Sequence, residues 1–185
     1  MTRPHHGAFF LCIFLAVAWS ALGAEEILIR PSDVPMDAPR FEDYPAKRYT
    51  GPNAAPDVQS DPRSRSYRTQ LRGWATEKPN FAGHYILATW GCGTGCAQIA
   101  VIDAASGKVF HPVGVRTTSV ADVDAELLDS DDNPSPRRAD FGSLRYRADS
   151  RLLVLFGTPE RKENRGISYY LWEGEAMKRI RFVPR

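Results

Sequence analysis

The sequence predicts a mainly β protein of the α+β kind: an antiparallel sheet or small β-sandwich of hairpins with one N-terminal helix, preceded by a proline-rich arm. Two observations predict this fold. Short runs rich in aromatic and β-branched residues, separated by tight-turn sequences, fill most of the chain after residue 81. Before them, one stretch after residue 60 spaces its apolar residues as a helix does. The two halves of the strand-rich part look loosely alike, which leaves two propeller-like blades as a minor alternative.

Residues 1–24 have the pattern of a secretory signal peptide. Arg3 supplies positive charge, an apolar run spans Ala8–Trp19, and small residues follow it, ending at Ala24. The apolar run is short for a transmembrane helix, which needs about 20 residues, so an uncleaved anchor is the weaker alternative. We expect cleavage after Ala24 and a periplasmic or secreted protein, with no transmembrane segment in the remaining chain.

The charge balance argues against nucleic acid as a partner. The chain has 24 basic and 22 acidic residues, a formal net charge of +2. A chain so close to neutral has no electrostatic reason to bind a phosphate backbone.

Residues 25–62 form a proline-rich arm. Seven of the fourteen prolines lie between Pro31 and Pro62, and proline removes a backbone donor and interrupts both helices and central strands. We expect an extended segment that wraps the domain or stays mobile. The remaining residues, 63–185, are enough for a single domain with its own hydrophobic core.

Helix signals begin at Ser60-Asp61-Pro62, where a capping side chain precedes an early proline. Tyr67, Leu71 and Trp74 follow at spacings of four and three, which places them on one helical face. We expect one helix that ends near Lys78, because the next residue is a proline.

Strands follow from residue 81 onward. Tight turns are expected at residues 104–107, 148–150 and 173–175. Residues 114–141 are expected to be irregular and acidic, with a short helix around Val120–Leu128. The predicted strands are Tyr85–Trp90, Ala97–Asp103, Lys108–Val113, Ser143–Arg147, Arg151–Phe156, Gly166–Trp172 and Met177–Val183.

Cys92 and Cys96, the two cysteines outside the signal peptide, predict a hairpin tip closed by a disulfide. An even pair of cysteines in an exported protein favours a disulfide. A straight strand separates positions 92 and 96 by about 13 Å, whereas a disulfide needs Cα atoms about 4.4–6.8 Å apart. The chain must therefore reverse between them, and Gly93 and Gly95 allow the positive φ angles that a tight reversal requires.

A metal site and a redox pair are the alternatives for these two cysteines. Zinc suits two cysteines with His84 and His111, but the spacing matches no zinc pattern. In the expected register, with Ala88 opposite Ala100, both histidines lie well down the sheet from the tip. Catalytic dithiols usually have two residues between the cysteines, and here there are three. An envelope thiol-redox or metal-dependent enzyme is therefore the second hypothesis.

Other motifs for chemistry are weak. Residues 129–140 place acids and amides at positions of a calcium loop, but Pro134 stands where that loop needs glycine, and Asp140 stands where it needs the longer glutamate. We expect a solvated loop there. The nucleophile elbow of Ser-His-Asp hydrolases is absent, so we expect His84 and His111 to be half-buried and hydrogen-bonded.

The run PNFAGHY, followed by WGCGTGC and VIDAASGKV, carries a resemblance. It resembles an uncharacterised family of small exported bacterial proteins with an F-A-G-x-Y stretch and a W-G-C-G-x-x-C loop. The match covers about residues 79–109. The resemblance implies export from a bacterium and names no activity.

The leading functional hypothesis is a non-enzymatic binding or inhibitor-like module that presents the hairpin tip to an envelope protein. A rigid tip lowers the entropy cost of binding. We expect no cofactor and no metal, and the sequence leaves the oligomeric state open. The candidate binding residues are Gly93, Thr94 and Gly95 at the tip, Trp90 at its base, and Tyr85 and His84 further along the strand.

Overall fold

The computed structural model describes residues 28–120, 123–128, 143–160 and 164–185. These residues form one eight-stranded antiparallel sheet with the order β1-β2-β4-β6-β7-β8, in which β3 also pairs with β2 and β5 with β6. The predicted fold class, mainly β with an antiparallel sheet, is confirmed. The strands are β1 Tyr85–Gly91, β2 Cys96–Asp103, β3 Val109–Phe110, β4 Thr117–Val120, β5 Leu144–Tyr146, β6 Leu152–Pro159, β7 Gly166–Trp172 and β8 Met177–Pro184.

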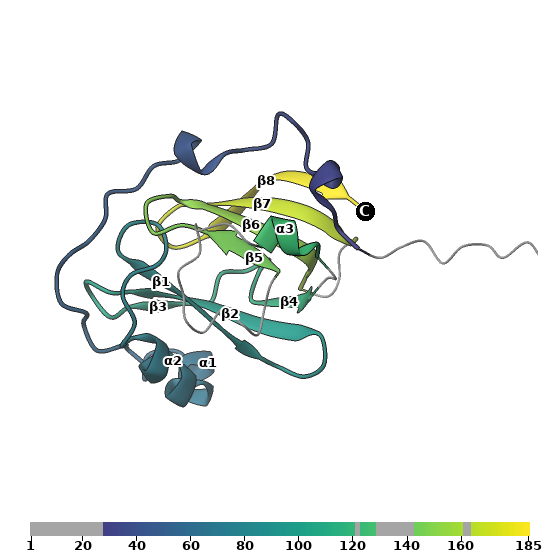
Figure 1. Ribbon diagram of the computed structural model, residues 1–185. Coiled ribbons are helices and arrows are strands. Elements are labelled where there is room, and N and C mark those ends of the chain that lie inside the picture. Colours follow the sequence, from purple (N-terminus) through teal and green to yellow (C-terminus); the bar gives the residue numbers. More distant parts are fainter. Residues whose placement is uncertain (1–27, 121–122, 129–142, 161–163) are drawn as a thin grey trace, which may run out of the picture.

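The sheet has two halves that lie as two layers, joined by β4 (Figure 1). The first half-sheet contains β1, β2 and β3, and the second contains β5 to β8. A single cluster of buried side chains, the inner cluster, contains residues of both halves, so the two halves bury one face against each other. Its members include Tyr85, Leu87, Ile99 and Val101 from the first half-sheet and Leu153, Leu155, Tyr170 and Trp172 from the second.

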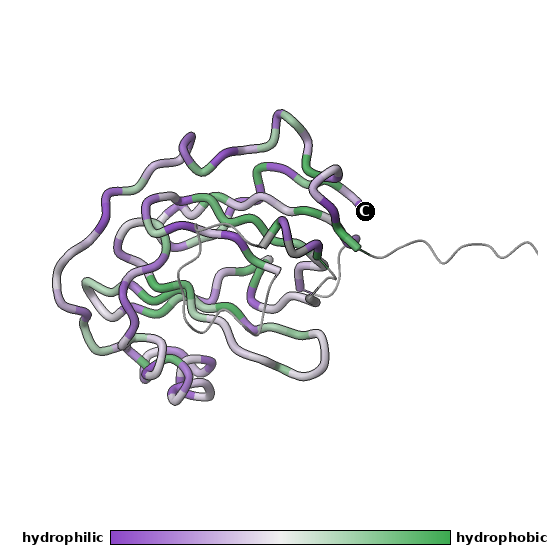
Figure 2. The backbone as a smooth tube through the Cα atoms, in the orientation of Figure 1, coloured by the Kyte–Doolittle hydropathy of each residue, from purple (hydrophilic) through white to green (hydrophobic). Residues whose placement is uncertain are grey.

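Strict alternation along the strands explains why both faces of the sheet are apolar. In β1, Leu87 belongs to the inner cluster, whereas Ile86 and Ala88 belong to a second cluster on the outer face. In β6, Leu153 lies inside and Leu152 outside in the same way. Hydrophobic residues accordingly concentrate along the strands, while the helices and the arm carry much of the hydrophilic sequence (Figure 2).

Two short helices cover the outer face of the first half-sheet, α1 Pro62–Ser66 and α2 Arg68–Trp74. The predicted start is confirmed, because the Asp61 carboxylate accepts hydrogen bonds from the backbone N–H groups of Arg63 and Ser64. Leu71 and Trp74 are buried against the sheet as expected.

The prediction of one helix reaching Lys78 is wrong. The backbone leaves helical geometry at Tyr67, where φ is −106° and ψ is 19°, and α2 ends at Trp74. The side-chain amide of Asn53 in the arm donates to the carbonyl oxygens of Ala75 at 2.8 Å and Glu77 at 2.7 Å. The arm therefore binds the carbonyls that follow the last helical turn, and no helical continuation satisfies them.

The described part of the arm wraps the sheet as an extended segment (Figure 1). Three backbone N–H groups of the arm form hydrogen bonds of 2.7–3.0 Å with carbonyl oxygens next to the strands of the first half-sheet. They are those of Tyr49 with Gly83, Ala54 with Ala104, and Asp57 with Gly107. Two 3₁₀ turns, η1 Pro31–Asp33 and η2 Phe41–Asp43, interrupt it. The arm also covers the outer face of the second half-sheet, where Val34, Ala38, Phe41 and Tyr44 pack against a third apolar cluster.

The central strand β4 was not predicted, because residues 114–141 were expected to be irregular. β4 joins the two half-sheets: Ser119 pairs with Cys96 of β2 on one side and with Thr158 of β6 on the other. Its sequence, TTSV, is short and mostly polar, so it gives little hydrophobic signal. Within the same region, α3 Ala125–Leu128 lies inside the range expected for a short helix.

Two expectations fall outside the described residues. The signal peptide at residues 1–24 and the calcium-loop interpretation of residues 129–140 both lie in undescribed segments. Among the residues that the structure describes, no helix has the length and apolar character needed to span a membrane.

Candidate functional site

The loop between β1 and β2 is closed by a disulfide between Cys92 and Cys96, as predicted, with the two Cα atoms 5.1 Å apart. The backbone N–H of Cys92 donates to the carbonyl oxygen of Cys96 at 3.1 Å, and the N–H of Cys96 donates to that of Gly93 at 3.2 Å. The predicted register is also confirmed, since Ala88 pairs with Ala100. One covalent bond and two hydrogen bonds therefore fix the shape of the loop.

The hairpin tip, residues Gly91–Gly95, is exposed along its whole length. Gly93 has a φ of 124° and Gly95 a φ of 61°, so the reversal uses the backbone freedom that only glycine offers cheaply. A Cβ atom on either glycine would meet nothing within 4 Å. The tip extends beyond the neighbouring strands and carries neither a charged nor a strongly hydrophobic stretch (Figures 1 and 2).

Trp90 anchors the tip instead of being presented beside it. Its side chain is only 7% exposed and belongs to the cluster between the first half-sheet and the helices. Its ring packs on that of Tyr67 with centroids 5.0 Å apart. The Tyr67 hydroxyl in turn accepts a hydrogen bond from the side-chain amide of Gln98 at 2.8 Å. The prediction of Trp90 as a contact residue therefore needs correction, because a partner at the surface cannot reach the indole.

Tyr85 and His84 lie at the other end of β1, seven or eight residues from Cys92, a distance of roughly 23–26 Å along a strand. Tyr85 is buried in the inner cluster, and its hydroxyl donates to the carbonyl oxygen of Gly174 at 3.3 Å. Burial raises the pKa of this tyrosine. His84 stacks on it with ring centroids 4.0 Å apart and lies 3.8 Å from the Asp103 carboxylate. The structure thus does not bring these two residues together with the tip.

His111 makes a contact that the sequence did not indicate. Its Nε2 atom lies 3.0 Å from the hydroxyl oxygen of Ser64 and 3.8 Å from a carboxylate oxygen of Asp61. Burial lowers the pKa of His111, more strongly than the Asp61 carboxylate raises it. Ser64 and Asp61 approach the same ring nitrogen, and the serine is fully buried. The arrangement is therefore not a nucleophilic triad, which needs an accessible hydroxyl and a carboxylate on the opposite nitrogen.

The described part of the chain contains no cluster of side chains that could bind a metal ion. No group of three or more histidine, cysteine, aspartate or glutamate side chains lies close enough to hold an ion there. Both cysteines are joined to each other, and His84 and His111 have the separate partners described above.

The F-A-G stretch joins three segments of the fold. Phe81 is fully buried in the inner cluster. The backbone N–H of Gly83 donates to the carbonyl oxygen of Ala148 at 2.7 Å, and its own carbonyl accepts from the N–H of Tyr49 at 3.0 Å. Gly83 has a φ of 88°, and a Cβ there would collide with the carbonyl oxygen of Lys47. The F-A-G stretch therefore has a structural role, because it docks the arm and the turn after β5.

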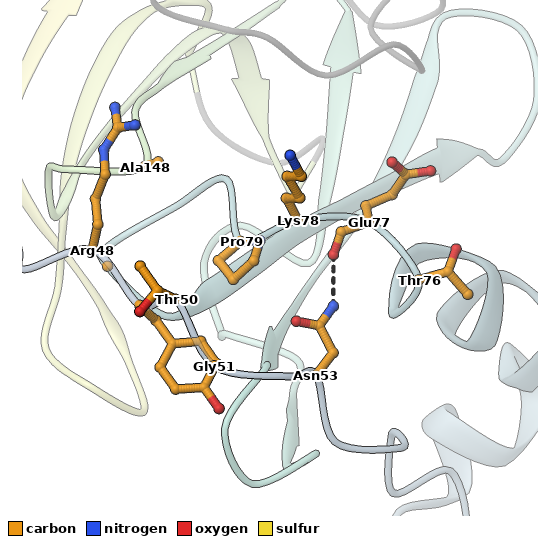
Figure 3. Close-up of a pocket in the computed structure, with 11 residues that line it drawn as sticks. Arg48, Thr50, Gly51, Asn53, Thr76, Glu77, Lys78, Pro79 and Ala148 are labelled. Carbon is orange, nitrogen blue, oxygen red and sulfur yellow. Dashed lines mark hydrogen bonds between the residues drawn. The ribbon is translucent and has the colours of Figure 1, made fainter.

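A cavity of about 450 Å³ lies beside this junction (Figure 3). It was not predicted, since its walls come from the arm, from the connection after α2 and from the turn after β5. In Figure 3, Arg48 and Lys78 extend from two of these segments, and the Asn53 amide is held by the Glu77 carbonyl. Arg48 lies 3.7 Å from the Asp149 carboxylate. The lining residues with polar side chains are Arg48, Tyr49, Thr50, Asn53, Thr76, Glu77 and Lys78.

Comparisons with models of protein families, with curated proteins and with solved structures find no match to this chain. The function therefore has to be inferred from the geometry of the chain itself.

Proposed function

We propose that this protein is an exported, non-enzymatic binding module that inserts its hairpin tip into a cleft of an envelope protein, in the manner of an inhibitor loop. The observation that carries the proposal is the combination of full exposure and fixed shape at Gly91–Gly95. A loop that is already ordered loses little conformational entropy when it binds. The anchoring of Trp90 on Tyr67 supports the same interpretation, because it holds the base of the hairpin in place.

The side chains at the tip indicate what kind of cleft a partner protein would have. Thr94 is the one residue between the cysteines with a side chain beyond a hydrogen atom. The carbonyl of Gly93 accepts the Cys96 N–H within the loop, but no side chain shields the backbone at Gly93 or Gly95, where even a Cβ atom would meet nothing within 4 Å. The tip therefore suits a narrow cleft that hydrogen-bonds to a backbone, and it offers no charge for a strongly charged surface.

Replacement of the one side chain at the tip tests the proposal. Thr94→Arg introduces bulk and charge at an exposed position, so the fold should survive while binding is lost. Thr69→Arg is the matched control, since Thr69 is an exposed threonine on α2, away from the tip. The three proteins would be used as bait in envelope extracts, and each captured protein would be purified and titrated. Unchanged urea midpoints with binding lost only in Thr94→Arg support the tip, whereas equal binding by all three proteins rules it out.

Thiol exchange is the second candidate function, because the two cysteines differ in exposure. Cys92 is exposed, whereas Cys96 is only 5% exposed. An external thiolate would therefore attack the sulfur of Cys92, form a mixed disulfide and release Cys96 as a thiolate. Protein isolated from the periplasm should then carry alkylatable thiols or a mixed-disulfide adduct in its intact mass. A mass two hydrogens light that resists alkylation, even after incubation with reduced glutathione, would remove this candidate.

A further inference from the structure

The cavity in Figure 3 has two cationic side chains on its wall. Arg48 belongs to the arm and Lys78 to the connection after α2, and both are exposed. Arg48 lies 3.7 Å from the Asp149 carboxylate, which is too long for a hydrogen bond. That carboxylate is instead bound by Arg147, with hydrogen bonds of 3.0 and 3.2 Å. The Arg48 guanidinium can therefore bind a ligand.

Lys78 is the second cation, and its ammonium group has neither an ion pair nor a hydrogen-bond partner within the described residues. Among the described residues of the wall, Glu77 is the one acid. Its carboxylate points away from Pro79 and Asn53 in Figure 3. The wall therefore attracts an anion more than a cation.

Asn53 supplies an oriented acceptor. Both N–H bonds of its amide are used by the carbonyl oxygens of Ala75 and Glu77, which fixes the nitrogen of the amide on that side. Its Oδ1 atom accepts no hydrogen bond within the described residues, and it is not one of the buried side-chain atoms without a partner there. A ligand can therefore reach this oxygen, which lies on the Pro79 side of Asn53 and away from Thr76 (Figure 3).

Tyr49 and Pro79 give the cavity an apolar surface. The Tyr49 hydroxyl donates to the carbonyl oxygen of Pro52 at 2.9 Å, and the ring lies so close to Gly51 that a Cβ atom there would collide with it. These two contacts hold the aromatic ring in place. A flat ligand with an apolar face and a polar edge suits a wall of this kind.

We propose that this cavity binds a single hexuronic acid, a sugar whose ring carries a carboxylate. Arg48 and Lys78 attract the carboxylate, and one sugar hydroxyl donates to Oδ1 of Asn53. The sugar ring lies against Tyr49 and Pro79. A phosphate ion would place acceptors against the Asn53 oxygen, and a fatty acid would leave that oxygen without a donor.

The size of the cavity agrees with one sugar unit. Its volume is about 450 Å³, which holds roughly fifteen heavy atoms at about 30 Å³ each, and a hexuronic acid has about thirteen. The cavity shares no residue with the hairpin tip, so the inference does not depend on the proposed function of the tip.

An NMR titration of the ¹⁵N-labelled protein with glucuronate, galacturonate, glucose and acetate tests the proposal. Glucose keeps the ring and the hydroxyls without the charge, and acetate keeps the carboxylate without the ring. We expect one or both uronates to bind at least about fivefold more tightly than glucose and acetate, because exposed cations add a modest attraction. The backbone signals of Thr50, Gly51 and Lys78 should shift, since these residues line the cavity.

Three results of this titration would overturn the proposal. They are absence of binding by both uronates at tens of millimolar, an affinity for glucose or acetate equal to that of the uronates, and shifts confined to residues outside the cavity.

Lys78→Gln separates a site from general attraction of charge. It removes one exposed cation, so the uronate should bind about two- to fivefold more weakly, while the affinity for glucose and the thermal midpoint stay unchanged. Arg48→Gln should act in the same direction. Lys178→Gln is the matched control, because Lys178 is an exposed lysine on β8 that does not line the cavity. Equal weakening by both lysine variants, or none in Lys78→Gln and Arg48→Gln, would also overturn the proposal.

Discussion

The rings of Trp90 and Tyr67 pack with their centroids 5.0 Å apart, and this contact ties the base of the exposed hairpin to the junction between the two short helices. Tyr67 is the residue at which α1 ends and α2 begins. One aromatic contact therefore joins the residue where the two helices meet to the base of the hairpin.

Trp90→Ala should lower the free energy of unfolding by about 3–5 kcal/mol, the usual cost of deleting a large buried aromatic side chain. Urea denaturation followed by circular dichroism measures it. Trp90→Phe is the control and should cost much less, because the indole N–H has no hydrogen-bond partner within the described residues. A loss below about 1 kcal/mol for the alanine variant would show that the pair does not anchor the hairpin.

Replacement of Gly83 by alanine should lower the free energy of unfolding more than replacement of Gly95, because, of the two, only Gly83 has backbone atoms close to where a Cβ would lie. Gly83→Ala places a Cβ against the carbonyl of Lys47 at a φ of 88°, so we expect a loss of at least about 2–3 kcal/mol in unfolding free energy. Gly95 also has a left-handed backbone, with a φ of 61°, but a Cβ atom added there would have open space around it. The loss for Gly95→Ala should be about 1–2 kcal/mol, the cost of left-handed backbone alone. Equal losses in urea denaturation would contradict the docking role of Gly83.

Much of the fold was predictable because the strands alternate strictly and their turns carry glycine or aspartate. β7 was predicted at its observed bounds, Gly166–Trp172, and the register of the first hairpin followed from the position of the two cysteines. β4 could not be predicted in the same way. It is a four-residue polar segment whose place in the sheet comes from pairing with two distant strands, and not from its own sequence.

The candidate site was predictable only where it is local in sequence. The tip lies within five consecutive residues, so spacing and geometry defined it. Trp90 was misjudged because the sequence does not say which face of β1 the helices cover. The contact of Ser64 with His111 and the cavity in Figure 3 join segments separated by tens of residues, and no spacing rule connects such segments.

Removal of the disulfide should cost stability modestly and leave the fold intact. Cys92→Ser with Cys96→Ser opens a ring of five residues, and the chain-entropy relation gives about 2 kcal/mol for so short a ring. The bulk of the stability lies in the three apolar clusters, which the double variant does not touch. Urea denaturation of the variant and of reduced wild type should agree. Failure of the double variant to fold would show that the ring, and not the clusters, decides folding.

Protonation of His111 should make the protein less stable as the pH falls through the range just below 6.5. Burial lowers the pKa of this histidine below its ordinary 6.5, so the unfolded chain binds a proton in that range while the folded chain does not. Stability therefore is fully present above pH 6.5 and decreases as the pH falls toward the lower pKa of the folded state. Ser64 contacts the ring directly, the charge of Asp61 raises the pKa of His111, and the charges of Arg63 and Arg116 lower it.

Urea denaturation at pH 7.5, 6.5 and 5.5 measures this dependence, and His111→Gln should flatten it. The glutamine keeps a hydrogen-bonding group near Ser64 but takes up no proton. His84→Gln is the matched control, because His84 is the other histidine of the described residues and lies half-exposed at the end of β1. The carboxylates whose pKa values are lowered, among them Asp61 and Asp149, keep their contribution to stability above a pH of about 4 and lose it only as the pH falls below that, toward their lower folded-state pKa values. A slope that persists in His111→Gln and disappears in His84→Gln would show that the wrong histidine has been assigned.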